Sequence, residues 1–218
     1  MLSDLDIGMN DWVVPRLAWD DSYKPNRGRV LSKADLDNGP KFYRYHNEDE
    51  NFVTPRTLPG VSTKGAFFIR GSGHNKFGGY TEQPAEYQEV MDRLKKKHAA
   101  SAKFIPAPEI IRREGAKFGV ITMGGCDPAV REALELLDRQ GTPADYMRLK
   151  GFPFSEAVEE FLANHEFCFV VEQSRDAQLR SLLTLETAVP KEKLKSVLAY
   201  SGFPLSASHV VKEIQGQI

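Results

Sequence analysis

The chain has 218 residues, 41% of them hydrophobic, and its 29 basic and 30 acidic residues leave a formal charge of −1. This size allows one substantial core with a smaller appendage, and the balanced charge provides no electrostatic footprint for nucleic acid or an anionic membrane surface. Because no apolar stretch reaches the ~18 residues of a membrane span and the first residues lack the features of a secretory signal, we expect a cytoplasmic chain with neither nucleic-acid nor membrane partners.

Residues 1–60 are predicted to form an irregular, extended N-terminal arm or linker. Turn-forming and charged residues dominate this segment, and neither a helical nor a strand period persists in it. It nevertheless carries many aromatic rings, which disordered segments usually lack. These rings are Trp12, Trp19, Tyr23, Phe42, Tyr43, Tyr45 and Phe52. We expect the arm to lie against the α/β domain or against another subunit.

Residues 61–115 are predicted to form a connector made of a strand, a glycine-rich loop and an amphipathic helix. The strand is AFFIRG at 66–71, and the loop is GSGHNKFGGY at 71–80. The helix covers 84–98 and is followed by an extended, proline-marked segment. Its apolar stripe consists of Tyr87, Val90, Met91 and Leu94.

Residues 116–218 are predicted to form an α/β domain, an open and mostly parallel sheet with flanking helices. Four strand-like segments each precede an amphipathic helix. These segments are KFGVITM at 117–123, DYMRLK at 145–150, FCFVVEQS at 167–174 and SVLAYS at 196–201. Parallel sheets of this kind place ligand and partner surfaces at the carboxyl ends of their strands, so the functional residues are expected there.

The first strand ends in the turn MGGCDP at 123–128. Gly124 and Gly125 allow the backbone to turn tightly, while Asp127 is expected to cap the following helix with Pro128 at its first position. Exposed amides at such a turn can meet an anion. Because no complete nucleotide-binding fingerprint is present, we favour a structural turn over a phosphate site.

The starts of the other helices also contain polar residues that are candidates for helix capping or for contacts. Glu172 ends an apolar strand, so its carboxylate should emerge at the carboxyl edge of the sheet. We favour a hydrogen-bonded structural role over a ligand or partner contact for it. Asp176 is expected to cap the next helix. Ser206, between Leu205 and Val210, matches a hydrophobic staple at the start of the last helix.

The cysteines and histidines give no metal-ligand pattern. Cys126 and Cys168 are far apart, which argues against zinc or an iron-sulfur cluster within this chain. The helix dipole beside Cys126 could activate its thiol, but a small residue in a tight turn explains it as well, and Cys168 reads as a core residue. His74 is the one histidine on a glycine-rich loop, where a partner contact is conceivable. The other four histidines are expected at the surface.

Several of these short sequence motifs occur in an order that resembles one family, the α subunits of 2-oxoacid:ferredoxin oxidoreductases, especially the 2-oxoglutarate type. In the α/β domain these motifs are MGGCDP, LKGFPF, VVEQSRDAQL and YSGFPLS. Upstream, FYRY with TPRTLPG resembles the family's linker, GSGHNKFGGYTEQP resembles its glycine-histidine segment, and LSDLDIGMN resembles the last strand of the preceding pyrimidine-binding domain. The resemblance covers nearly the whole chain and implies a transketolase C-terminal-like domain.

The chain departs from this family in informative places. The family's YPITPSS-like segment, which contributes to the thiamine diphosphate site, is missing, so the chain resembles a C-terminal portion. Ala177 stands where the family has glycine, and Gly125 with Cys126 replaces a serine-threonine pair. By the resemblance, thiamine diphosphate, magnesium and the iron-sulfur cluster belong to partner subunits or to the missing domain, and this chain alone binds none of them.

The resemblance and the sheet edge together give candidate contacts with substrate or partner, and no catalytic or metal-binding residue. The candidates are Arg44, Arg56, His74, Asn75, Gly124, Gly125, Asp127 and Glu172. Arg44 or Arg56 could pair with a carboxylate or a phosphate, and the alternative is that both are exposed linker arginines.

Three functional hypotheses follow. The leading one is a component of an enzyme that oxidatively decarboxylates a 2-oxoacid, such as 2-oxoglutarate, to its acyl-coenzyme A. Its partners would be a thiamine-binding β subunit, other oxidoreductase subunits, and ferredoxin as electron acceptor, and the isolated chain would be inactive. The alternative is a non-catalytic α/β binding or assembly module. The third is an independent small-ligand enzyme using Cys126, which would require a reactive thiol.

Overall fold

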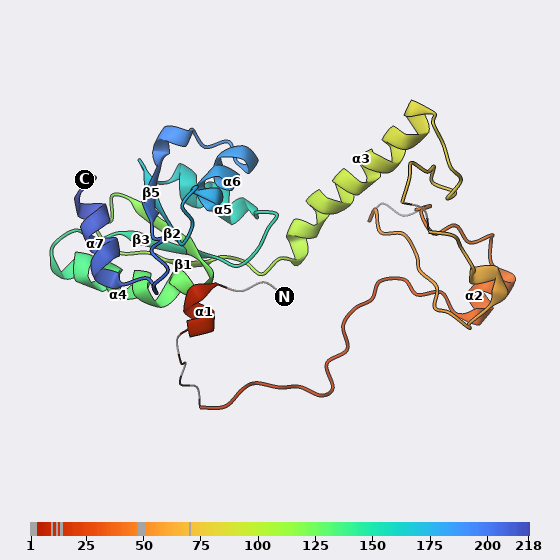
Figure 1. Ribbon diagram of the computed structural model, residues 1–218, viewed down its shortest axis with the longest axis horizontal. Coiled ribbons are helices and arrows are strands. Elements are labelled where there is room, and N and C mark those ends of the chain that lie inside the picture. Colours follow the sequence, from red (N-terminus) through yellow and green to blue (C-terminus); the bar gives the residue numbers. More distant parts are fainter. Residues whose placement is uncertain (1–3, 10, 12, 14, 48–50, 70) are drawn as a thin grey trace. The chain divides into compact units, whose positions relative to one another are not determined.

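The computed structural model describes residues 4–9, 11, 13, 15–47, 51–69 and 71–218 (Figure 1). Its contacts divide the chain into two units. Unit 1 combines Met1–Pro15 with Lys103–Ile218, and unit 2 is Arg16–Ala102. The predicted arm and connector therefore share unit 2 for most of their length. Trp12, one of the rings assigned to the arm, lies outside the described residues.

Unit 1 contains a five-stranded sheet of order β1-β3-β2-β4-β5. The strands are β1 (Glu109–Ile111), β2 (Gly119–Met123), β3 (Asp145–Leu149), β4 (Cys168–Glu172) and β5 (Leu194–Leu198). The edge strand β1 runs antiparallel to β3, and the remaining pairs are parallel. The predicted α/β fold class and its four parallel strands are confirmed, and β1, which the sequence indicated only as extended connector, adds an edge.

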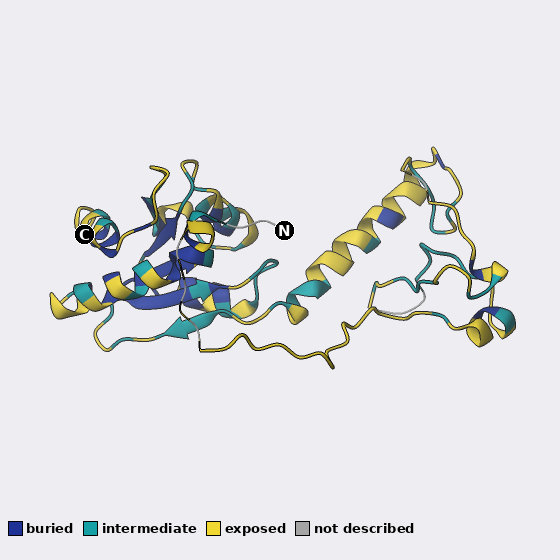
Figure 2. Cartoon of the chain, turned by 60° about the horizontal axis from the view of Figure 1, so that its bottom comes forward, coloured by how far each residue is buried: buried dark blue, intermediate teal, exposed yellow. Residues whose placement is uncertain are grey.

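Helices cover both faces of this sheet. They are α4 (Asp127–Arg139), α5 (Glu156–Ala163), α6 (Gln178–Glu186) and α7 (Ala207–Gln215). Unit 1 also has the 3-10 turns η3 (Gly124–Cys126) and η4 (Lys191–Lys193), and the turn η2 (Ser101–Phe104) crosses from unit 2 into unit 1. Helices α4 and α7 share one apolar cluster with Val120, Tyr146 and Phe169, whereas α5 and α6 share the other with Ile121 and Met147. Figure 2 shows the buried residues concentrated in these layers. The core thus consists of one sheet between two helical layers.

The amphipathic helices predicted after the strands bury their apolar stripes. The buried side chains are Val130, Ala133, Leu134 and Leu137 of α4, Val158, Phe161 and Leu162 of α5, and Leu179 and Leu183 of α6, while Leu182 is half-buried. Gly141 follows α4 at φ +76°, the left-handed conformation of a helix terminator. Ser206 caps α7 and accepts a hydrogen bond from the His209 amide. Leu205 and Val210, the two residues of the predicted staple, lie in the same buried apolar cluster.

The N-terminal segment of unit 1 corrects one prediction. Residues 2–10 resembled a strand, but the described part forms a short helix, α1 (Leu5–Met9). The Asp4 carboxylate accepts a hydrogen bond from the Ile7 amide at 2.9 Å. This is the geometry by which an aspartate begins a helix, and it satisfies one of the free amides of the first turn.

Unit 2 contains α2 (Lys33–Asn38), the 3-10 turn η1 (Thr63–Gly65) and α3 (Pro84–Ala100). Ser32 and Asp35 form a reciprocal capping box at α2, and Leu36 is buried, with Gly65 directly against it. The predicted helix at 84–98 is confirmed as α3. Only Val90 of its apolar stripe is buried, because unit 2 supplies few apolar partners for that face.

The predicted strand at 66–71 is wrong for the residues that can be described there. Residues 66–69 are coil, and Phe68 and Ile69 are each 72% exposed. Phe67 instead meets Phe42 edge-on, with ring centroids 5.9 Å apart. A strand needs a neighbour that completes its hydrogen bonds, and the described part of unit 2 provides pairing only at isolated bridges, such as Val30 with Arg56.

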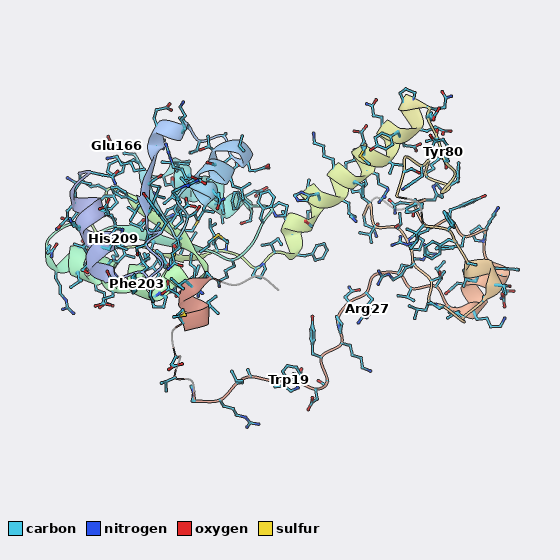
Figure 3. All side chains as sticks on the ribbon, viewed as in Figure 1. Trp19, Arg27, Tyr80, Glu166, Phe203 and His209 are labelled. Carbon is cyan, nitrogen blue, oxygen red and sulfur yellow. The ribbon has the colours of Figure 1, made fainter. Side chains whose placement is uncertain are left out.

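Residues 16–30 form an extended segment with exposed side chains. Leu17, Trp19 and Tyr23 are 77%, 83% and 73% exposed, and Figure 3 shows Trp19 projecting from the segment. Trp19 and Tyr23, two rings of the predicted arm, are therefore not buried within unit 2. Among the described helices, none is long and apolar enough to cross a membrane.

Ala177 provides a direct test of backbone strain. It begins α6 at φ +50°, a conformation that costs a residue with a β-carbon about 1 kcal/mol. Replacing Ala177 with glycine should raise the free energy of unfolding by up to about 1 kcal/mol, after subtracting the greater freedom of glycine in the unfolded chain. Urea denaturation measures this change. Ala163→Gly, at an exposed position of α5, should lower stability by up to about 1 kcal/mol, and equal destabilisation by both variants would contradict the strain.

Candidate functional site

The carboxyl edge of the sheet is shaped by where the chain connections diverge. From β2 the chain passes to β3 on one side, while β4 and β5 lie on the other. In sheets of this kind, such a switch point leaves a crevice between the two central strands. Here a cavity of about 520 Å³ lies there. Its lining residues are Asp4, Ile7, Met123, Gly124, Cys126, Glu172, Gln173, Ser174, Gln178, Leu179 and Leu182.

The chain's own Asp4 occupies the Gly124-Gly125 turn. The Gly125 amide donates to Asp4 Oδ2 at 2.8 Å, and Gly124 adopts φ +62°. A β-carbon on Gly125 would lie 2.4 Å from Asp4 Oδ1, and one on Gly124 would lie 2.7 Å from Oδ2. The two glycines therefore make room for a carboxylate, and the amide that sequence reasoning offered to an external anion is used internally.

Asp6 strengthens this docking of the N-terminal segment. Its side chain is buried, at 3% exposure, and its Oδ2 accepts a hydrogen bond from Gln173 Nε2 at the end of β4. Asp4 and Asp6 thus tie α1 to the turns that follow β2 and β4. The sequence held no sign of this contact, because Asp4 and Gly125 are 121 positions apart.

Asp127 does not cap α4, which corrects the prediction. The 3-10 turn η3 runs directly into the helix, so Asp127 is itself helical and Cys126 precedes it without a side-chain cap. The Asp127 carboxylate instead accepts from Tyr146 Oη at 2.6 Å and from Arg131 Nε at 2.8 Å. Arg148 lies 3.4 Å from its other oxygen. Asp127 therefore joins α4 to β3 as part of a buried polar network.

Tyr146 shows how enclosed this network is. Its hydroxyl is buried, and burial together with the hydrogen bond to Asp127 raises the pKa of Tyr146 well above its ordinary value. Arg131 also pairs with Glu109 on β1 at 2.7 Å. These contacts hold the strands and α4 together, and they explain Asp127 without a ligand.

Glu172 is buried and closes the start of α6. Its Oε2 accepts from the Leu179 amide at 2.8 Å, and its Oε1 accepts from the Arg180 amide at 3.2 Å. A carboxylate at this position satisfies free amides and complements the positive end of the helix dipole. Asp176, the expected cap, pairs with Arg175 instead. The sequence did not indicate Glu172 as the acceptor at the start of α6, because Glu172 lies outside this helix, seven positions before Leu179.

The two cysteines are buried and free. Burial raises the pKa of the Cys126 thiol to about 11, with Asp6 and Asp4 adding to the shift. Burial likewise raises the pKa of Cys168 to about 12. Activation of Cys126 by the helix start, one of the two readings left open by the sequence, is not supported, because burial raises the pKa of the thiol and two carboxylates lie nearby.

In unit 2, His74 and Asn75 belong to a closed loop. The Asn75 side-chain oxygen accepts from the amides of Phe77 and Gly79, at 3.1 and 3.0 Å. The His74 ring stacks on Tyr45, with centroids 4.0 Å apart, and its Nδ1 lies 3.0 Å from the Asn75 carbonyl oxygen. Since a carbonyl only accepts, Nδ1 carries the proton and the ring orientation is fixed.

Arg44 and Arg56 lie in the same unit with different surroundings. Arg44 Nη1 donates to Thr54 Oγ1 at 2.5 Å and to the Pro55 carbonyl at 3.4 Å. Arg56 is held by its backbone, whose amide donates to the Arg29 carbonyl at 3.0 Å. Both side chains are half-buried, so neither is a freely exposed linker arginine.

The structure thus brings most of the predicted contact residues together in two groups, one in each unit. Gly124 and Glu172 line one cavity in unit 1. Gly125 and Asp127 lie in the adjoining turn and helix start. Arg44 neighbours Tyr45, which stacks on His74, in unit 2. Whether any of them contacts a ligand remains a proposal. Among the other histidines, His165 is buried against Asp145 at 3.1 Å, contrary to the surface position expected for it.

No protein-family model and no curated protein matches the chain. Among solved structures, 2-oxoglutarate:ferredoxin oxidoreductase from Magnetococcus marinus, with 2-oxoglutarate, coenzyme A and succinyl-CoA bound, is similar with a TM-score of 0.73 and 23% identity over 83% of this chain. The chain spans 31% of that oxidoreductase chain. This likeness shows a shared fold.

Two further structures match less well. The α chain of a probable 2-oxoacid ferredoxin oxidoreductase from Thermoplasma acidophilum has a TM-score of 0.35 and 23% identity, covering 50% of this chain and 95% of that chain. A split-gene transketolase has a TM-score of 0.38 and 17% identity, covering 50% of this chain and 40% of that chain.

Replacing Glu172 with alanine should destabilise unit 1 strongly. The variant leaves two amides at the start of α6 without their charged acceptor, and a hydrogen bond to a charged group contributes about 1.5–3 kcal/mol. We expect the free energy of unfolding to fall by about 2–3 kcal/mol in urea denaturation. Glu186→Ala, at the exposed end of the same helix, serves as control. A loss no greater than that of the control would remove the capping role.

Replacing Gly125 with alanine should displace the N-terminal segment. The new β-carbon would overlap Asp4 Oδ1, so α1 should leave the edge while the sheet stays folded. Hydrogen exchange at residues 5–9 should then become at least about tenfold faster. Gly8→Ala is the matched control, because no atom lies within 4 Å of its added carbon. Unchanged exchange in Gly125→Ala would contradict the docking.

Native Cys126 should react slowly with iodoacetamide near neutral pH. With a pKa of about 11, its thiolate fraction is about two orders of magnitude below that of an ordinary cysteine. Mass spectrometry should show modification of both cysteines only after unfolding in urea. Rapid, selective alkylation of Cys126 in the folded chain would revive the hypothesis of an independent thiol enzyme.

Proposed function

We propose that this chain is a component of a 2-oxoacid:ferredoxin oxidoreductase and corresponds to the C-terminal portion of its α subunit. The observation that carries the proposal is the fold shared with the Magnetococcus marinus enzyme over 83% of the chain, because the ordered sequence words point independently to the same family. The chain contributes assembly and contacts at the edge of the active site, and works in the cytoplasm with a thiamine-binding β subunit.

The proposed reaction is the oxidative decarboxylation of a 2-oxoacid. The whole enzyme would release CO2, join the acyl group to coenzyme A and pass the electrons to ferredoxin. The Magnetococcus marinus enzyme was solved with 2-oxoglutarate and coenzyme A, which favours 2-oxoglutarate as the substrate here. Thiamine diphosphate would supply the carbanion chemistry when bound, and an iron-sulfur cluster would carry electrons.

We propose that thiamine diphosphate is held outside this chain. The amide of the Gly124-Gly125 turn already donates to Asp4, so a diphosphate at that turn would have to displace that carboxylate. This fits a role in which partner subunits or a preceding domain hold the cofactors.

What this chain can offer is a rigid edge. Asp4 and Asp6 fasten the N-terminal segment to the ends of β2 and β4, while Glu172 fixes the start of α6. In the proposed enzyme, a pyrimidine-binding domain before this segment would be oriented by these contacts. Arg44, Arg56, His74 and Asn75 are the proposed contacts in unit 2.

A non-catalytic assembly module is the second candidate function. The exposed apolar side chains of Leu17, Trp19 and Tyr23 favour it, because rings that stay in water on the isolated chain are typical of a surface that another protein covers. Both candidates predict a complex. They differ in whether the complex transfers electrons.

Reconstitution tests the proposal. The chain would be co-expressed with a matching thiamine-binding β subunit and the pyrimidine-binding portion, and coenzyme A-dependent reduction of viologen would be assayed with 2-oxoglutarate and with pyruvate. We expect activity with 2-oxoglutarate that disappears when this chain is omitted. A stable complex without activity would leave the assembly module, and failure to form any complex would remove both candidates.

A further inference from the structure

Unit 2 contains two guanidinium groups held by one short segment. Arg93 on α3 donates through Nη1 to the Phe52 carbonyl at 3.0 Å, and Arg44 donates to Thr54 and Pro55 just beyond it. Phe52 adopts φ +60°, a conformation that a bulky residue rarely takes and that tends to occur at functional sites. The backbone that presents its carbonyl to Arg93 is therefore under strain.

Neither arginine has a carboxylate partner among the residues that the structure describes. Their acceptors are two carbonyls and a hydroxyl, all neutral. Arg93 Nε is buried and has no hydrogen-bond partner, and leaving a buried donor unpaired costs about 1–3 kcal/mol. Since Nη1 is engaged, the edge formed by Nε and Nη2 remains, and this edge matches the two oxygens of a carboxylate or phosphate.

The surroundings of the Arg93 guanidinium also lack a compensating negative charge among its described hydrogen-bond partners. Burial and the nearby positive charge of Arg44 together lower the pKa of Arg93 from its ordinary value. Two guanidinium groups that disfavour each other's charge gain from an anion placed between or beside them. The structure supplies no such group from the described chain.

A cavity of about 610 Å³ opens beside Arg93. Its charged lining residues are Lys76, Glu89, Asp92, Arg93 and Lys96. Glu89 is already paired with Lys76 at 2.9 Å, so Arg93, Lys96 and the neighbouring Arg44 outweigh the remaining carboxylate of Asp92. Aromatic walls come from Tyr45, His46 and Phe52. The size and mixed lining are those of small-molecule sites.

We infer that this cavity binds a small molecule through an anionic head group, a carboxylate or a phosphate, that pairs with the Arg93 guanidinium, with Lys96 and Arg44 close by. The aromatic walls receive the body of the ligand. The site stands independently of the proposed oxidoreductase function. The sequence did not indicate this site, because Arg93 lies outside the apolar stripe of the predicted helix and Phe52 is 41 positions away.

Titration of the full ¹⁵N-labelled chain tests this site. Inorganic phosphate and acetate would be added separately at constant ionic strength, and the Nε–H signal of Arg93 followed by NMR. We expect a saturable shift with at least one of them, and the tighter of the two identifies the head group. No saturable shift with either anion up to about 50 mM, well above the millimolar affinity of a weak site, would overturn the inference.

Three variants separate a specific site from general attraction to positive charge. Arg93→Lys keeps the charge but loses the two-donor edge, so affinity should fall at least about tenfold. Lys96→Gln, at an exposed position, should weaken binding about two- to fivefold. Arg27→Lys, on the exposed extended segment (Figure 3), is the control and should bind as the parent does.

The variants also guard against a purely structural role for Arg93. If Arg93→Lys lowers the melting temperature, the Lys96→Gln titration still decides the question in a folded protein. Equal affinity of the parent, Lys96→Gln and Arg27→Lys chains would overturn the inference. Reduced affinity in Lys96→Gln with an unchanged melting temperature would support it.

Discussion

The arrangement of unit 1 depends on carboxylates that satisfy backbone amides at the carboxyl edge of the sheet. Parallel strands end there and helices begin there, so unpaired amides accumulate in one place. Glu172 serves the amides that open α6, and Asp4 serves the Gly125 amide. Asp127, although also at this edge, binds Tyr146 and Arg131. The usual ligand-binding edge of an α/β sheet is thus largely occupied by the chain's own acids.

This constraint accounts for the division of labour that we propose. An edge whose anion-accepting turn is filled by Asp4 is suited to fastening a neighbouring segment, whereas catalysis with a diphosphate cofactor needs that turn open. The Magnetococcus marinus oxidoreductase shares this fold in a chain about three times as long. A component that orients other parts of a larger enzyme is consistent with both facts.

Unit 2 is stabilised by different interactions. It buries few apolar residues, and its shape comes from local hydrogen bonds, such as those of Asn75 within its loop, and from stacked rings such as Tyr45 on His74. Leu17, Trp19 and Tyr23 remain exposed. A unit with so little core gains stability from bound partners or ligands. Its most informative features are therefore its exposed rings and the two arginines, Arg44 and Arg93, whose described acceptors are all neutral.

The sequence by itself determined the α/β fold class, the four parallel strands, α3 and the inward faces of α4 and α5, because these depend on local periodicity and on turn residues near in sequence. Only the tertiary structure decided what each polar group at the edge does. Asp4 and Gly125, Glu172 and Leu179, and Arg93 and Phe52 are pairs whose members lie 121, 7 and 41 positions apart. Local pattern cannot express such pairings, and it likewise cannot show that the apparent strand at residues 66–69 lacks a neighbour, since a strand exists only through another strand.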